Sequence, residues 1–222
     1  MSMAAQMQRR QLDELQLDAL KELGNVGASH ASAALSNLVS KDIVIDVAEC
    51  VPLPMKKMHS RFGKPGEVLA LIAIDVKASG RSRMIIIFPK NVATELSDLM
   101  FQRPVQVPRK LTPEDKEALV EMGDFCIREY LNPISRFLKV DQMPSPPIAT
   151  FDVIGNDMDI PQKFGILTTG YDIKVDANFV DQKGNFQGAI TYLPDATTQS
   201  LTFQKFGVDD AALNSTFNKF GV

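Results

Sequence analysis

Three polar residues follow one another at helical spacing near the start of the chain. Asp18, Glu22 and Asn25 stand at positions i, i+4 and i+7. At about 100° per residue, these positions lie within roughly 60° of one another around a helix, so they form one polar stripe. The amide of Asn25 offers a hydrogen donor and an acceptor oxygen on the same face as a carboxylate. Such a pair can position a water molecule.

A positioned water is most of what hydrolysis of an acyl phosphate on a partner protein requires. Phosphoryl transfer depends mainly on positioning and on neutralising charge. A solvated helix face is the simpler interpretation of any polar stripe. However, asparagine and glycine are poor residues for a helix interior, and Gly24, Asn25 and Gly27 occur together here. Close packing explains the glycines but not Asn25.

The composition excludes several other classes of function. The 222-residue chain is 45% hydrophobic, enough for a substantial core, and its net charge of −3 provides no basic field for nucleic acid. Neither a phosphate-binding glycine loop nor a calcium loop is present. His30 and His59 are the two histidines, which leaves few candidates for a metal site. We therefore expect no metal or cofactor on this chain.

The spacing of the cysteines and the length of the apolar runs bear on the cellular compartment. Cys50 and Cys126 are far apart and form no C-x-x-C pair. The first ten residues lack the apolar run of a signal peptide, and no stretch approaches the ~18 apolar residues of a membrane span. We expect a cytoplasmic protein without membrane insertion.

The polar stripe requires a long amphipathic helix, which we predict over residues 12–38. Its apolar or small residues recur at steps of three and four: Leu20, Leu23, Gly27, Ala31, Ala34 and Leu38. Strands are predicted over 42–49, 67–77 and 81–88, the last two joined by a turn at Ser79-Gly80. A helix from Pro89 to about residue 101 follows.

A similar order of elements then follows. Thr112 and Pro113 predict the start of a second long helix, which Asn132-Pro133 should bend or interrupt, leaving a short helical piece over 134–138. Strands are predicted over 148–154, 166–180 and 186–193, with a turn at 181–185 and a helical segment around Leu201.

The repeated order predicts an internal duplication. Leu119, Glu121 and Gly123 of the second long helix repeat the Leu, Glu and Gly of the segment that contains the stripe. We predict an α+β fold in which pseudo-two-fold halves form antiparallel sheet, as two sheets or one, with two long helices packed on it. A single domain would comprise repeats 12–101 and 111–206 after an N-terminal arm, 1–11.

The run from Asp18 to Asn25, followed by Val26-Gly27-Ala28, resembles the D-x-x-x-E-x-x-N signature of the CheC, CheX and FliY phosphatases. The duplicated halves are also similar to CheC. The resemblance implies a chemotaxis enzyme, a hydrolase that dephosphorylates the phospho-aspartyl group of a CheY-type response regulator in two-component signalling. Asn25 would orient the attacking water, Glu22 would pair with a lysine of the regulator, and Asp18 would support the stripe. Mg²⁺ would belong to the regulator.

Both copies depart from the family pattern, in which a proline follows the asparagine after 22 intervening residues. In the first copy Ala48 takes the place of that proline. In the second copy Pro147 is in place and Glu121 is retained. However, Glu117 replaces Asp or Ser, and Asp124 replaces Asn. An ionised carboxylate has no donor and repels a phosphoryl group, so we expect a weak or silent second site.

Two alternatives remain open. The chain could be a non-enzymatic adaptor that binds a response regulator or the receptor deamidase CheD. The loop Ile154–Pro161 lies where some family members meet CheD, although an ordinary connection between strands explains it equally well. A flagellar-switch component similar to FliY is less favoured, because such proteins carry an additional switch domain.

Overall fold

The computed structural model describes residues 14–52, 66–78, 80–153, 173–181 and 187–209. These residues form a seven-stranded antiparallel sheet and four helices, so the predicted α+β class is confirmed. The N-terminal arm, the turn at 182–185, the loop Ile154–Pro161 and His59 lie outside the described residues.

The first half follows the sequence prediction closely. Helix α1 spans Glu14–Val39 and strand β1 spans Ile43–Pro52. Strands β2 (Val68–Lys77) and β3 (Arg81–Pro89) pair antiparallel, as expected for a hairpin. Helix α2 occupies Lys90–Met100, with Pro89 at its N-cap rather than in its first turn.

The second half begins with helix α3, Pro113–Leu138. Thr112 caps it through a capping box: its side chain accepts from the N–H of Asp115, whose carboxylate accepts from the N–H of Thr112. Of the predicted bend or interruption at Asn132-Pro133, the interruption is wrong, because α3 continues through Pro133. Ile134 and Leu138 are buried in the core, and this packing stabilises the last turns despite the missing N–H of the proline.

Four strands and one helix complete the second half. Strand β4 (Met143–Pro144) was not predicted, whereas β5 (Ile148–Val153) and β7 (Gln187–Leu193) were. Strand β6 occupies Ile173–Asp181, and the start predicted for it at 166 lies outside the described residues. Helix α5, Ala196–Phe206, contains the predicted segment around Leu201.

The strand order is β1-β6-β7-β3-β2, with β4 and β5 both paired to β2. If β1, β2 and β3 are matched with β5, β6 and β7, this order reads the same from either edge. At the centre, β3 and β7 pair antiparallel with Ile86 opposite Ile190. The halves thus form one continuous sheet. The order agrees with a duplication, although the duplication itself and its repeat boundaries stay predictions.

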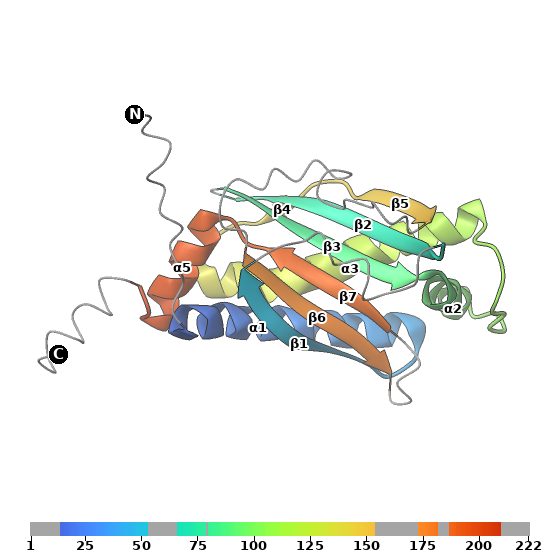
Figure 1. Ribbon diagram of the computed structural model, residues 1–222, viewed down its shortest axis with the longest axis horizontal. Helices are drawn as coiled ribbons and strands as arrows, with labels where there is room; N and C mark the ends of the chain where they lie inside the picture. Colours follow the sequence, from blue (N-terminus) through green and yellow to red (C-terminus); the bar gives the residue numbers. More distant parts are fainter. Residues whose placement is uncertain (1–13, 53–65, 79, 154–172, 182–186, 210–222) are drawn as a thin grey trace, which may run out of the picture.

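Helices α1 and α3 lie antiparallel on one face of the sheet (Figure 1). Buried residues of both helices meet alternate residues of the central strands in one core, including Leu20, Leu35, Ile72, Met122, Ile134 and Ile190. At the helix crossing, a Cβ added to Gly27 would lie 2.5 Å from the ring of Tyr130. Glycine at this position therefore allows the two helices to approach closely.

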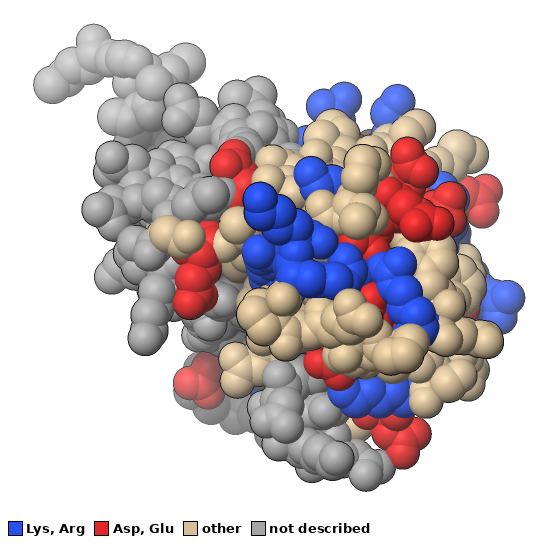
Figure 2. All heavy atoms as spheres, turned by 90° about the vertical axis from the view of Figure 1, so that its right-hand side faces the viewer, with Lys and Arg blue, Asp and Glu red and all other residues tan. Residues whose placement is uncertain are grey.

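The end of the molecule that carries α2 and the connector to α3 displays a cluster of Lys and Arg side chains (Figure 2). Within the connector, Arg103 and Arg109 each bind both Asp98 of α2 and Asp115 of α3. Both aspartate side chains are almost fully buried, at 1% and 0% exposed. These ion pairs join the end of the first half to the start of the second.

Within the described residues, no helix is long and apolar enough to span a lipid bilayer.

Candidate functional site

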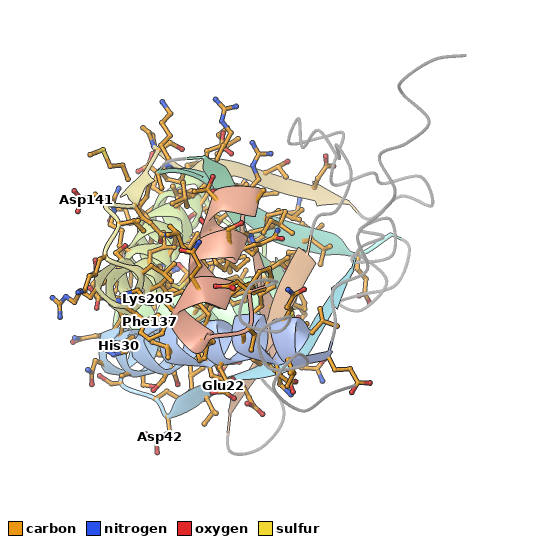
Figure 3. The ribbon with its side chains drawn as sticks, turned by 90° about the vertical axis from the view of Figure 1, so that its left-hand side faces the viewer. Glu22, His30, Asp42, Phe137, Asp141 and Lys205 are labelled. Carbon is orange, nitrogen blue, oxygen red and sulfur yellow. The ribbon has the colours of Figure 1, made fainter. Side chains whose placement is uncertain are left out.

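The predicted polar stripe lies on the part of α1 that faces solvent. Asp18 and Glu22 are exposed and Asn25 is half-buried. The amide Nδ2 of Asn25 donates a hydrogen bond to Oε1 of Glu22 at 3.3 Å. The structure thus brings the two predicted catalytic residues together, with Asp18 one helical turn before them. Figure 3 shows Glu22 and His30 at separate places along α1.

Serine side chains fix α1 against the edge strand β1. The hydroxyls of Ser32 and Ser36 both donate to the carbonyl oxygen of Ile43, at 2.6 and 3.0 Å. In return Ser36 accepts from the N–H of Ile43, and Ser32 accepts from the N–H of Ile45. Leu20 and Leu23 on the opposite side of the helix are buried in the core. The helix that carries the stripe is thus held by core packing at Leu20 and Leu23 and by hydrogen bonds to β1 at Ser32 and Ser36.

The strand beside α1 contains an irregularity at the position where the family has a proline. The pairing of β1 with β6 runs from Ile43 to Val47, omits Ala48, and resumes at Glu49. One extra residue opposite a regular partner strand is a β-bulge. Bulges and edge strands are where sheets accommodate proline. The replacement of proline by Ala48 therefore retains a backbone irregularity at that point.

The second copy of the stripe has a different arrangement on α3. Glu117 and Glu121 are exposed, as predicted for that face. Asp124 does not bond to Glu121; its Oδ2 accepts from Nε of Arg128 at 2.7 Å. The other oxygen of Asp124 is buried and has no hydrogen-bond partner among the described residues. Asp124 thus lacks the amide donor and is also occupied by an ion pair.

A further carboxylate and amide on α3 share the geometry of the first pair. Nδ2 of Asn132 donates to Oε1 of Glu129 at 3.4 Å, again across three residues. Asn132 is exposed and Glu129 is half-buried. This pair was not predicted, because Glu129 and Asn132 lie outside the positions matched by the duplication. Its signal in the sequence is the same E-x-x-N spacing as Glu22 and Asn25.

An open hollow lies between α1 and α3 on the solvent side of the helix layer. Its lining combines apolar and polar side chains: His30, Ala33, Ala34, Asn37 and Leu38 from α1, and Phe125 and Glu129 from α3. Leu38 and Phe125, both large apolar side chains, are 38% and 41% exposed there. No side chain predicted as catalytic lines this hollow.

No group of three or more His, Cys, Asp or Glu suited to a metal occurs in the part of the chain that the structure describes. Asp42, Asp46 and Asp152 form no such group, and Asp157 and Asp159 lie outside the described residues. What α1 offers is a half-buried amide, Asn25, beside an exposed carboxylate, Glu22.

Comparison with known proteins gives a consistent result. The model of the CheC-like family matches residues 15–47, which include Asp18, Glu22 and Asn25. The CheY-P phosphatase CheC of Bacillus subtilis is 25% identical over 146 residues, which cover 65% of this chain and 70% of that protein. The resemblance to the CheC-like family is confirmed.

Solved structures share the fold of this chain. Thermotoga maritima FliY superposes with a TM-score of 0.69 at 17% identity, covering 89% of this chain and 98% of that one. The FliM middle domain of H. pylori gives 0.58 at 11% identity, covering 87% and 99%. CheX of Desulfovibrio desulfuricans gives 0.53 at 11% identity, covering 78% and 99%. The fold therefore occurs in proteins with different names and roles.

Proposed function

We propose that this CheC-like protein acts in chemotaxis by dephosphorylating a CheY-type response regulator. The observation that supports this most is the hydrogen bond between Asn25 and Glu22, which lies in the segment matched by the CheC-like family. The B. subtilis relative is named for activity on phosphorylated CheY. We further propose a cytoplasmic location, in which the buried thiol of Cys126 would stay reduced.

The reaction is the transfer of the phosphoryl group from an aspartyl carboxylate to water. The water oxygen forms a bond to phosphorus while the bond from phosphorus to the aspartyl oxygen breaks. The aspartate leaves as a carboxylate, and inorganic phosphate takes the water oxygen. Asn25 accepts a hydrogen bond from the water through Oδ1, which holds the water in line. Mg²⁺ held by the regulator would neutralise the charge on the phosphoryl oxygens.

Glu22 has two tasks in this proposal. In the free protein its carboxylate accepts from Nδ2 of Asn25 and so limits the rotation of the amide. In the complex its exposed carboxylate pairs with a lysine of the regulator. Asp18, one turn earlier, adds negative charge toward the same lysine. The second copy at Glu117, Glu121 and Asp124 is weak or silent, because Asp124 has no donor and is paired with Arg128.

A non-enzymatic adaptor is the alternative, and the paired state of Asp124 favours it for the second copy. Such a protein would bind a response regulator, or CheD, without hydrolysis. The segment considered for CheD, Ile154–Pro161, lies outside the described residues, so this contact is part of the proposal only.

The test combines the purified chain with candidate phosphorylated regulators and follows the loss of phosphoryl label. Faster loss than the regulator's own decay supports the enzyme, and binding without acceleration supports the adaptor. Asn25→Ala and Glu22→Ala should each slow the reaction by at least ~10-fold. Ser29→Ala, an exposed change one turn after Asn25, is the matched control and should have no effect. Full activity of Asn25→Ala with loss in Asp124→Ala would mean that the halves are assigned wrongly.

A further inference from the structure

The Glu129–Asn132 pair repeats the chemistry of the proposed site on the neighbouring helix. In both pairs an asparagine three residues after a glutamate donates from Nδ2 to Oε1, at 3.3 Å in α1 and 3.4 Å in α3. Each pair therefore holds an amide against a carboxylate one helical turn away. In each pair the contact uses Nδ2 of the asparagine, so its Oδ1 can accept a hydrogen bond from a water molecule.

The helix crossing places the two pairs at the same level of the helix layer. Gly27 and Tyr130 are in contact where the helices cross. Asn25 lies two residues before Gly27, and Asn132 lies two residues after Tyr130. Because α1 and α3 run antiparallel (Figure 1), both amides lie on the same side of the crossing.

The hollow beside Glu129 provides apolar surface on which a partner protein could dock. Phe125 and Leu38 present apolar surface that water solvates poorly, and both line the hollow together with Glu129. Adjacent exposed apolar side chains, rimmed by polar ones, can mark a protein interaction site. A partner protein docked over this hollow would cover the Glu129–Asn132 pair as well.

Pro133 adds an acceptor at the same place. A proline inside a helix has no N–H to donate to the carbonyl oxygen four residues earlier, which here belongs to Glu129. The Glu129 residue thus offers a carboxylate and a backbone oxygen without its usual helical donor. A lysine ammonium of a partner, with three donors, is the kind of group that both oxygens suit.

We propose that Glu129 and Asn132 form a second water-positioning pair for a phospho-aspartyl receiver domain, in place of the disabled Glu121 and Asp124. This inference rests on the proposed function and adds a site to it. The chemistry is the same hydrolysis, with Oδ1 of Asn132 accepting from the attacking water and Glu129 pairing with the receiver lysine. Productive docking can then occur at either pair, so the two contributions add in kcat/KM.

The experiment measures kcat/KM of the full chain on a ³²P-labelled CheY-type receiver for Asn25→Ala, Asn132→Ala and the double variant. Removing one positioning group commonly costs about 10²-fold when no second site exists. We expect Asn25→Ala to leave hydrolysis above the receiver's own decay, and the double variant to lose that remainder. Asn132→Asp, which keeps the shape and removes the donor, repeats the test if Asn132→Ala fails to fold.

Two controls separate the possible outcomes. In the Asn25→Ala background, changing the exposed Asn91 of α2 to Ala should leave the remaining activity unchanged. Loss of the remainder through kcat supports a water-positioning role, whereas an effect of Asn132→Ala on KM alone would overturn it in favour of docking. If Asn25→Ala by itself reaches the receiver's own decay, the second pair is refuted and the proposed function stands. If the unmodified chain shows no acceleration, both proposals fail.

Discussion

Gly27 of α1 lies against the ring of Tyr130 of α3 so closely that a Cβ on Gly27 would be 2.5 Å from Cε1 and 2.6 Å from Cδ1. The Tyr130 side chain is fully buried, so its ring has no free space into which it can move. This contact sets how closely the two long helices approach. It therefore also sets the spacing of the polar pairs on their outer faces.

We predict that Gly27→Ala destabilises the protein. Overpacking of a buried contact costs about 1–3 kcal/mol, whereas the better helix propensity of alanine returns at most about 1 kcal/mol. Urea unfolding followed by circular dichroism measures the difference. Ser29→Ala, on the exposed side of the same helix, should change the free energy of unfolding by less than ~0.5 kcal/mol. A more stable Gly27→Ala protein would show that the helices can separate freely.

The buried ion pairs of the connector predict a loss of stability in acid. Burial alone would raise the pKa of Asp98, but hydrogen bonds from Arg109, the Gln106 N–H and Arg103 hold it below the ordinary value of 3.8. The pKa of Asp115 is lowered further, because Arg109 and other donors outweigh its burial. A lowered pKa contributes stability above the unfolded value, and this contribution is lost as the pH falls through the folded value. Unfolding should become easier below pH ~4.

The variant Asp98→Asn tests this account. At pH 7 it should lower the free energy of unfolding by about 3 kcal/mol, because it breaks a buried pair. The difference from the unmodified protein should shrink as the pH is lowered below ~3.8. Glu95→Gln, which breaks the more exposed pair with Lys41, should cost less than ~1 kcal/mol. If Asp98→Asn lowered the free energy of unfolding equally at pH 7 and at pH 3, the lowered pKa of Asp98 would be contradicted.

Local signals explain why most elements were predictable from the sequence. The Thr112-Pro113 start of α3 depends on residues within one helical turn, and the capping box confirms it. Strands β2 and β3 are marked by continuous apolar runs. The continuation of α3 past Pro133 was not predictable, because it depends on tertiary packing: Ile134 and Leu138 are buried in the core. Strand β4 depends on pairing with Val76 and Lys77 of β2, which no local pattern indicates.

The candidate site was predictable in part for the same reason. The spacing of Glu22 and Asn25 places both on one helix face, and the structure adds their hydrogen bond. The ion pair of Asp124 with Arg128 spans four residues and could have been read from the sequence. The bulge at Ala48 depends on a partner strand more than 100 residues away in the chain. The hollow between α1 and α3 depends on how two helices cross, which sequence periodicity does not determine.

The bulge predicts that Ala48→Pro is tolerated. Ala48 has no partner in the β1–β6 register, and proline is found at bulges and on edge strands. We expect a change in the free energy of unfolding within ~0.5 kcal/mol. Asp46→Pro is the control: Asp46 pairs with Asn178 within the regular ladder and its side chain is exposed. That change should cost about 1 kcal/mol or more, because a ladder hydrogen bond is lost. Equal losses in thermal melts would argue against the bulge.

The ion pair on α3 leads to a gain-of-function prediction, which rests on the proposed function. The background is the Asn25→Ala/Asn132→Ala protein, in which both proposed amides are removed. Adding Asp124→Asn supplies an amide three residues after Glu121. Adding Arg128→Ser as well removes the side chain that holds position 124 and introduces the residue type that Ser29 provides in the first copy.

The quadruple variant should hydrolyse the labelled receiver at least ~10-fold faster than the double-variant background, because an amide three residues after Glu121 is then no longer opposed by Arg128. Arg128→Ser alone in that background should give no gain, since the Asp124 carboxylate has no hydrogen to donate and repels the phosphoryl group. Asp124→Asn alone should give an intermediate rate if Arg128 still shields the new amide. Phosphate release under single-turnover conditions measures all three. A quadruple variant no faster than its background would show that a receiver domain cannot dock productively on the face of α3 that carries Glu121 and position 124.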